Sequence, residues 1–322
     1  MGGFLLPLYK EWCIIENMKK RVSVIILILC FLLAGGTVFV TWWKHTTPIK
    51  RHPFAKAVLT QNFDATGAQC IFHTWETKEG LVVIDGGSRA NSEYVRSVIK
   101  AKGGHVNAWI VTHGHPDHVG AFNEIYANPQ GIIIDDVYTT DFDLEKYHEL
   151  CNWWDEPEYY DEFWSLTHTN GEANDDFHTL KRGDLLKSCG LNIEVFSTFS
   201  EVGTDYGDDI ANLGSMMFKV NAGEVSVLYC SDIHNNRGLY DDIGDKYGDL
   251  LKADYLQMGH HGNNSCPASF IDLVSPSYAF FDCPKEFFDN PDYDAKENLE
   301  YMENKGVICY SFETAPNEII IK

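Results

Sequence analysis

The sequence contains one histidine-rich stretch, Thr112-His113-Gly114-His115-Pro116-Asp117-His118, on which the prediction of its fold depends. The stretch directly follows the apolar run Ala108-Trp109-Ile110-Val111, and a glycine pair, Gly103-Gly104, precedes that run. A short run of large and branched apolar residues after a glycine pair predicts a buried β-strand. Since α/β folds carry their chemistry at the carboxyl ends of strands, we expect the histidines to lie at a functional site.

Four potential metal ligands fall within six residues of this stretch. His113 and His115 alternate by two in an extended loop, so both can face one cation. Asp117 and His118 stand at the start of a predicted helix and can face a second cation. A histidine-rich turn can also be surface decoration, but two histidine pairs with an aspartate between them favour a metal site.

Two aspartates end other predicted strands. Asp85 closes the strand within residues 80–87, where it could brace the histidine loop by hydrogen bonding or simply occupy a turn. Asp232 follows the strand predicted for residues 224–231. It could bridge two metals, or it could cap a helix.

A later strand leads into Gly259-His260-His261-Gly262. One histidine of this pair is expected to bind a metal and the other to contact substrate. Because both adjoin the same loop glycines, the sequence leaves open which of the two is the ligand.

The chain carries 25 Lys and Arg residues against 47 Asp and Glu residues, a net charge of −22 over 322 residues. Such a charge disfavours nucleic acid as a partner and suits a cell-surface protein, although it also simply maintains solubility. Seven of the nine cysteines follow residue 43. An odd number makes a complete disulfide framework improbable.

Residues 22–43 carry no charge and would form a helix of roughly 33 Å, long enough to cross a bilayer. Lys19-Lys20-Arg21 precede them, which predicts a single-pass signal anchor with residues 1–21 as a short cytosolic tail. A cleaved signal peptide is the alternative. Residues 44–57 form a predicted linker, and residues 58–322 a domain outside the cell.

Residues 139–180 break the alternation of strands and helices with a mixture of aromatic and acidic residues. Such a mixture could cage a quaternary ammonium group by cation–π attraction. More often such aromatic residues simply pack an inserted helical hairpin onto the domain. An insertion near a metal site often acts as a lid.

Residues 58–322, apart from this insertion, resemble the metallo-β-lactamase superfamily. They look most like the hydrolase domain of the competence protein ComEC and its relatives, the phosphorylcholine esterases. The resemblance implies an α/β fold, an αββα four-layer sandwich of two sheets between helices. The stretches that carry it are Ile84-Asp85-Gly86-Gly87, the histidine-rich stretch, Asn212-Leu213-Gly214-Ser215, Ser231-Asp232-Ile233 and His260-His261-Gly262.

The resemblance implies two divalent cations, most simply zinc, with manganese as a second choice. In the assignment that we adopt, His113 and His115 bind the first and Asp232 bridges both. The ligands of the second are Asp117, His118 and His260. Many family members have a histidine near Asn212 that this chain lacks, and Ser231 replaces a usual glycine.

The expected chemistry is hydrolysis by a metal-bound hydroxide, with Asp117 and His261 as catalytic residues. A phosphodiester, either a small molecule or a cell-surface component, is the expected substrate. Nucleic acid is disfavoured by the net charge. The alternatives are acyl or lactam hydrolysis at the same site, and a non-catalytic surface protein that binds its ligand without turnover.

Overall fold

The structure is a computed structural model that describes residues 56–152, 154–202, 205–312 and 314–322. The predicted tail, membrane anchor and most of the linker lie outside these residues. Within the described part of the chain, no helix is both long and apolar enough to span a bilayer.

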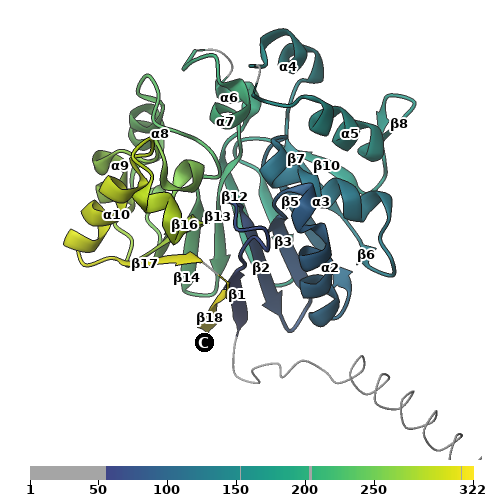
Figure 1. Cartoon of the computed structure of the whole chain (residues 1–322), viewed down its shortest axis with the longest axis horizontal. Coiled ribbons are helices and arrows are strands. Elements are labelled where there is room, and N and C mark those ends of the chain that lie inside the picture. The colour runs from purple at the N-terminus through teal and green to yellow at the C-terminus, as the bar shows by residue number, and fades with distance from the viewer. Residues whose placement is uncertain (1–55, 153, 203–204, 313) are drawn as a thin grey trace, which may run out of the picture. The chain divides into compact units, whose positions relative to one another are not determined.

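Two seven-stranded sheets form the centre of the domain (Figure 1). The first sheet has, in spatial order, β10 (Phe177–Leu180), β7 (Val137–Thr140), β5 (Ala108–Val111), β3 (Leu81–Asp85), β2 (Phe72–Thr77), β1 (Ala57–Gln61) and β18 (Asn317–Ile321). Its strands are parallel from β10 to β3 and antiparallel from β3 to β18. The predicted pair of strands around the charged turn at residues 76–79 is confirmed as β2 and β3.

The second sheet likewise combines a set of antiparallel strands with a set of parallel strands that follow them in the chain. Its strands, in spatial order, are β11 (Leu185–Ser188), β12 (Leu191–Ser197), β13 (Met217–Ala222), β14 (Val225–Tyr229), β15 (Tyr255–Gln257), β16 (Tyr278–Pro284) and β17 (Ile308–Phe312). The strands are antiparallel from β11 to β14 and parallel from β14 to β17. In both sheets the parallel strands are the ones that run into predicted site residues.

Helices cover the outer face of each sheet. Those on the first sheet are α2 (Ser92–Ala101), α3 (Pro116–Ala127) and α5 (Glu158–Thr167), and those on the second are α8 (Leu239–Tyr247), α9 (Ala268–Val274) and α10 (Ala295–Asn304). Short helices α4 (Leu144–Leu150), α6 (Phe199–Val202) and α7 (Ile210–Leu213) gather above the carboxyl ends of the parallel strands in Figure 1.

Buried apolar side chains form three clusters, one for each boundary between four layers. One cluster joins the inner faces of the two sheets, for example Ile110 of β5 and Phe218 of β13. The second packs α2 and α3 onto the first sheet, and the third packs α8, α9 and α10 onto the second sheet. An amphipathic helix and a sheet each bury one face in this way, so the predicted αββα sandwich is confirmed.

The predicted insertion at residues 139–180 begins and ends inside the first sheet, because β7 and β10 pair in parallel. Between them lie α4, α5 and a small hairpin of β8 (His168–Thr169) and β9 (Glu172–Ala173). We use the term inserted segment for residues 141–176. The short strands β4 (His105–Val106) and β6 (Ile133–Ile134) pair in a separate two-stranded sheet.

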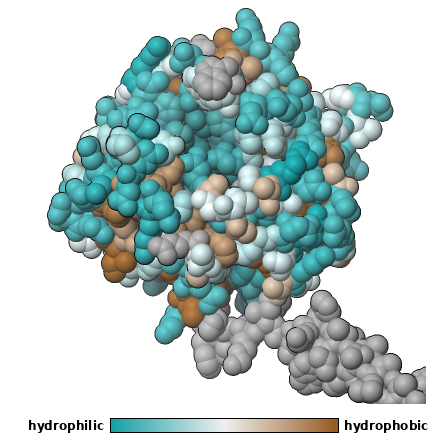
Figure 2. Space-filling model, viewed as in Figure 1, coloured by the Kyte–Doolittle hydropathy of each residue, from teal (hydrophilic) through white to brown (hydrophobic). Residues whose placement is uncertain are grey.

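The surface agrees with the acidic composition. Hydrophilic residues cover most of the face shown in Figure 2, and hydrophobic patches on it are small. Large apolar side chains that are exposed, such as Trp154 and Leu185, are scattered, which is normal for a folded domain.

Candidate metal centre

The histidine-rich stretch forms the loop between β5 and α3, as the sequence predicted. His115 has extended backbone angles directly before α3, and Pro116 occupies the first helical turn, where its missing N–H has no cost. Asp232 follows β14, and His261 lies in the turn η3 (Gly259–Gly262) after β15. The carboxyl ends of parallel strands from both sheets therefore contribute to one site.

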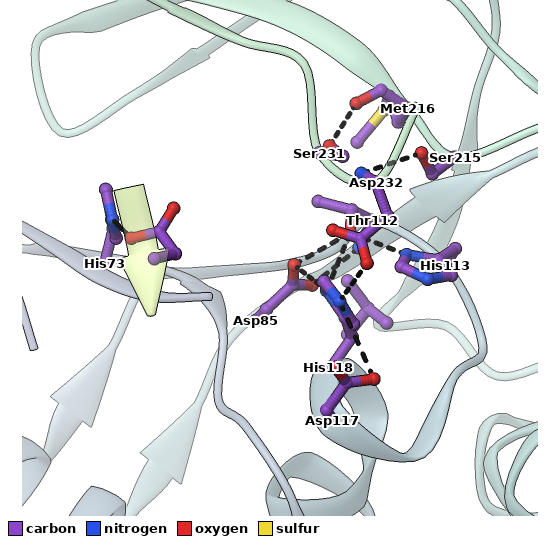
Figure 3. A network of polar contacts seen from close by, with 12 residues as sticks. His73, Asp85, Thr112, His113, Asp117, His118, Ser215, Met216, Ser231 and Asp232 are labelled. Carbon is purple, nitrogen blue, oxygen red and sulfur yellow. Dashed lines mark hydrogen bonds and ion pairs between the residues drawn. The ribbon is translucent and has the colours of Figure 1, made fainter. Parts of the chain in front are cut away.

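Four side chains converge there, and we call them the inner donor group: Asp117, His118, Asp232 and His261. One oxygen or nitrogen from each lies within 4.8 Å of all the others. The Asp232 carboxylate is central, with Oδ2 3.0 Å from Nε2 of His118 and 3.2 Å from Nε2 of His261. Asp117 Oδ2 lies 3.3 Å from the same nitrogen of His261. Figure 3 shows His118 between the Asp117 and Asp232 carboxylates.

These atoms approach one another without satisfying hydrogen-bond geometry. Among the described residues, the buried atoms without a hydrogen-bond partner include Nε2 of His113, His118 and His261 and Oδ1 of Asp232. Buried polar groups in folded proteins are almost always satisfied, so four such atoms in one place need an explanation. A divalent cation with imidazole and carboxylate ligands fits them, and donor sets of this kind suit zinc, manganese or iron.

Two buried acceptors fix how the histidines of this group present their nitrogens. Asp85 accepts hydrogen bonds from the Thr112 backbone N–H at 2.7 Å and from Nδ1 of His118 at 2.9 Å. His261 Nδ1 donates to the backbone carbonyl of Asp282 at 3.0 Å. Each Nε2 is thereby left unprotonated in the neutral ring and free to bind a metal. The prediction that Asp85 braces the histidine loop is confirmed.

Asp232 is held by its own neighbours. Its backbone N–H donates to Ser215 Oγ at 3.1 Å, and the Ser231 hydroxyl donates to the Met216 carbonyl. Ser231 has a φ of 50°, in the left-handed region that glycine adopts most easily. This explains why a glycine is usual at this position, and the hydrogen bond of the serine compensates for part of the strain.

Electrostatics couple the carboxylates and imidazoles of the inner donor group. Burial opposes ionisation of Asp232, but His118 and His261 outweigh it and hold the pKa of Asp232 well below its usual range. Burial alone would lower the pKa of His261, but Asp232 and Asp117 outweigh it and raise that pKa to about 10. An environment that favours protons this strongly also favours a divalent cation.

A second set of three side chains, which we call the outer donor group, lies beside the first. It consists of His115, Asp155 and Asp209, whose ligand atoms also lie within 4.8 Å of one another. His115 Nε2 is 2.9 Å from Asp155 Oδ1. The His113 ring lies between the two groups, with its centroid 4.8 Å from the ring of His115 and 4.0 Å from that of His118.

Sequence reasoning missed Asp155 and Asp209. Asp155 is one of many acids in the inserted segment, and Asp209 is the N-cap residue of α7, where its side chain accepts from the backbone of Asn212. Nothing in the local sequence distinguishes either residue from its acidic neighbours. The only available signal was the missing histidine near Asn212, which implied that some other group takes its place.

The geometry corrects the assignment of the histidine pair. We expected His260 to bind the metal and His261 to be catalytic, but His261 is the one in the inner donor group. His260 Nδ1 donates to the backbone carbonyl of Asn263 at 3.0 Å. Both residues have left-handed backbone angles, with φ of 46° and 57°, so their side chains leave the turn in different directions.

Several aromatic residues of the inserted segment pack into the core. Tyr147, Tyr160 and Phe163 are buried in the cluster beneath α3 and α5. Phe142 contacts both tyrosines, at ring-centroid distances of 5.0 and 4.6 Å. Of the two functions considered for this segment, the structure favours the packed helical hairpin for these residues.

Comparison with known proteins agrees with this architecture. Residues 70–130, which contain β2, β3, β5 and the histidine-rich loop, match the sequence model of the metallo-beta-lactamase superfamily. CmlA, a diiron β-hydroxylase from Streptomyces venezuelae, superimposes with a TM-score of 0.50 and 10% sequence identity, over 83% of this chain and 54% of that one. The chain has the metallo-β-lactamase fold.

Two further solved structures superimpose on this chain with slightly lower TM-scores. The metallo-beta-lactamase fold protein YhfI from Bacillus subtilis has 14% sequence identity to this chain and a TM-score of 0.47. The match covers 82% of this chain and 99% of that chain. Igni18, a metallo hydrolase from Ignicoccus hospitalis, has 13% identity and a TM-score of 0.49, with coverage of 83% and 100%. No curated protein sequence matches significantly. At such identities the metallo-β-lactamase fold is shared, and activity has to be argued from the site.

Proposed function

We propose that the chain is a hydrolase that uses two divalent cations and acts on phosphodiesters. The observation that carries this proposal is the convergence of buried, unpartnered imidazole and carboxylate atoms at one end of both sheets. In this assignment, the second cation is held by Asp117, His118 and His261. His113 and His115 would hold the first cation. Asp232, which has one oxygen towards the inner donor group and the other unpartnered, would be shared by both cations.

Bound cations would supply Lewis acidity and lower the pKa of a water molecule to about 7. The protein itself supplies position. Asp117 is the most accessible member of the inner donor group, with its side chain 26% exposed, and Gln69 Nε2 donates to its Oδ2 at 3.2 Å. Asp117 is therefore the residue best placed to orient a nucleophile while remaining a ligand.

We assign substrate contact to His260 in place of His261. His260 is partly buried beside the centre, and its Nδ1–H is occupied by the Asn263 carbonyl. Its Nε2 is thus the atom left to meet a substrate oxygen. Burial lowers the pKa of His260, and in its neutral ring Nε2 carries a lone pair, so it can accept a hydrogen bond from a substrate hydroxyl or a water molecule.

A phosphodiester is favoured because paired cations clamp both the attacking and leaving oxygens of an in-line displacement. The net charge of −22 disfavours DNA or RNA and favours a small or cell-surface substrate. We retain the ComEC and phosphorylcholine esterase branch as the proposed relationship, on the motifs around Asp85, Asp232 and His261.

We also propose that residues 22–43 anchor the chain in the cell membrane, with the hydrolase domain outside the cell. The support is in the sequence: 22 residues without a charge follow the basic triplet Lys19-Lys20-Arg21. A fractionation of cells that express the full chain would test this. Release of the domain by carbonate or high salt would contradict a spanning anchor.

The activity is tested on the full chain, freed of metal and reloaded with zinc or manganese. Bis(nitrophenyl) phosphate and a nitrophenyl ester of phosphorylcholine report phosphodiester cleavage, and nitrophenyl acetate and a chromogenic lactam report acyl chemistry. We expect turnover of the first pair that a chelator abolishes and added metal restores. Turnover of the second pair alone would replace the proposal with acyl or lactam hydrolysis.

A non-catalytic binding protein would give a different result. It would turn over none of the four substrates when loaded with metal, and would bind its ligand equally well without metal. The rate ratio of the phosphorylcholine ester to bis(nitrophenyl) phosphate adds information on specificity. Because Tyr147, Tyr160 and Phe163 of the inserted segment are buried, they cannot contact the choline group, and we expect no large preference for it.

A further inference from the structure

The outer donor group joins three parts of the chain that are far apart in sequence. His115 comes from the histidine-rich loop, Asp155 from the inserted segment and Asp209 from the start of α7. The contacts of the two carboxylates differ, and the difference indicates which one can bind a cation.

Asp155 has both oxygens occupied. Oδ1 accepts from His115 Nε2 at 2.9 Å, and Oδ2 accepts from the backbone N–H of Asn152 at 2.5 Å. Asp85 holds His118 in the same way, because one of its oxygens accepts from one ring nitrogen of that histidine. In both cases a fully buried aspartate holds one ring nitrogen, and the other nitrogen of the ring is left for a ligand.

Asp209 is oriented but less completely satisfied. Oδ2 accepts from Nε2 of His234 at 3.1 Å and from Nδ2 of Asn212 at 3.1 Å, whereas Oδ1 has only a long contact of 3.4 Å with the Asn212 backbone N–H. His234 is fixed in turn, because Asn264 Nδ2 donates to its Nδ1 at 3.2 Å. A carboxylate anchored through one oxygen keeps lone pairs on the other for a cation.

His113 gives independent evidence that a ligand belongs here. Its side chain is buried, and its Nε2 has no hydrogen-bond partner among the described residues. The ring lies beside that of His115. An unpartnered imidazole nitrogen in a ring beside His115, which itself lies within 4.8 Å of a buried and a partly buried carboxylate, is the arrangement that a bound cation would satisfy.

We propose that Asp209 is the third protein side chain, besides His113 and His115, that binds the first cation without being shared with the second. A carboxylate would then take the place of an imidazole, and Asp155 would be a positioning residue that holds His115. This inference rests on the two-cation centre of the proposed function. A donor set of two imidazoles and one carboxylate suits manganese or iron better than a set of three imidazoles does.

The inserted segment is thereby tied to the first cation. Besides the Asp155–His115 bond, the Tyr160 ring lies against Gly114, where any Cβ would come within 2.3 Å of the ring. The close approach explains why the residue between the two histidines is glycine. A shift of the segment would move His115, so the segment and the first cation stabilise each other.

The test compares Asp209→Asn with Asp208→Asn in the full chain. Asparagine has one acceptor oxygen, which can keep the bond from His234, and its N–H₂ group then replaces Oδ1, the oxygen with only the long contact. Asp209→Asn therefore removes the charge and the proposed ligand oxygen, and it also weakens the cap on α7. Asp208 is exposed on the same loop, and its variant makes the same change in net charge. Metal content after dialysis and calorimetric titration with Mn²⁺ and Zn²⁺ are measured for each.

We expect the parent chain and Asp208→Asn to hold two equivalents. Asp209→Asn should hold one equivalent tightly and bind the other at least about tenfold more weakly. Asp209→His, which supplies an imidazole but is a poor helix cap, should recover the second equivalent. Two tight equivalents in Asp209→Asn, equal losses in both Asn variants, or a single equivalent in the parent chain would each overturn the proposal.

The outcomes separate this inference from the proposed function. If the parent chain binds two cations and Asp209→Asn loses one, but no phosphodiester is cleaved, the ligand assignment stands and the activity does not. If phosphodiesters are cleaved while Asp209→Asn keeps both cations, only the ligand assignment fails.

Discussion

The inner and outer donor groups are built in different ways although they lie side by side. Inner members follow strands of the two sheets, and their histidines are held by Asp85 and by the carbonyl of β16 residue Asp282, both inside the core. The outer group takes Asp155 from an inserted segment and Asp209 from a four-residue helix. The inner group is therefore positioned by the two sheets, and the outer group depends in part on the inserted segment through Asp155.

The difference has a functional consequence. A site on strand ends is rigid, since many core contacts would have to shift together before it moved. A site on an inserted segment can change its metal affinity when the segment moves. We therefore expect the second cation to bind tightly and uniformly, and the first to respond to changes far from it in sequence.

The largest effect should come from the paired variants His261→Ala and His260→Ala. Loss of His261 removes a ligand from the inner group, so turnover should fall at least about a thousandfold, or about 4 kcal/mol in transition-state stabilisation. One cation should be lost with it. His260→Ala should keep both cations and lose only substrate stabilisation. Metal content and kcat/KM are measured together for both variants. If His260→Ala loses a cation while His261→Ala keeps both, the original assignment of His260 as the metal ligand is restored.

Asp85→Asn should have the next largest effect. The amide can still accept from Thr112 but places an N–H₂ against the protonated Nδ1 of His118, or forces that ring to flip. We expect metal affinity at the inner group to drop about 10- to 100-fold. Calorimetric titration checks this, and an unchanged affinity would mean that Asp85 supports the loop without orienting the ligand.

Asp155→Asn should have a smaller effect that is confined to the first cation. The amide oxygen can still accept from His115, but its N–H₂ group then faces the Asn152 backbone N–H, and the charge that polarises the ring is lost. We therefore expect a loss of about tenfold in affinity. Glu156→Gln is the matched control, because Glu156 is exposed beside it. If Asp155→Asn weakened both cations equally, the two groups would not be the separate units described above.

The smallest effect concerns the pH dependence of the metal-free chain. Burial disfavours the charged ring of His261, yet Asp232 and Asp117 raise its pKa to about 10. The stabilisation from this proton is complete below about pH 6.5, the pKa of an unfolded histidine. It should be lost as the pH rises from about 6.5 through 10, since the native ring then gives up the proton.

Urea midpoints at several pH values, with chelator and with zinc, measure this effect. Metal should abolish the decline, because a bound cation displaces the proton that the ring would otherwise lose. The lowered pKa of Asp232 acts in the other direction, since its stabilisation is lost only as the pH falls below about 3.9. A midpoint that does not change between pH 6.5 and 10 in the metal-free chain would show that the inner group does not hold this proton.

The sequence by itself determined the architecture and most of the inner donor group. Short continuous runs of large and branched apolar residues predict strands that are buried on both faces, and β3 and β5 appeared close to where they were expected. Asp117 and His118 were recognised because they are neighbours in sequence at a strand end. Local sequence is sufficient when ligands, strand and helix start are consecutive.

Only the tertiary structure decided between His260 and His261, because both adopt left-handed backbone angles in one turn and their directions depend on that turn. It also decided that Asp85 braces His118, where sequence left a turn residue equally possible. Asp155 reaches His115 only because Tyr160 packs the inserted segment onto Gly114. Contacts between segments separated by dozens of residues arise from packing of the whole domain, and no local pattern encodes them.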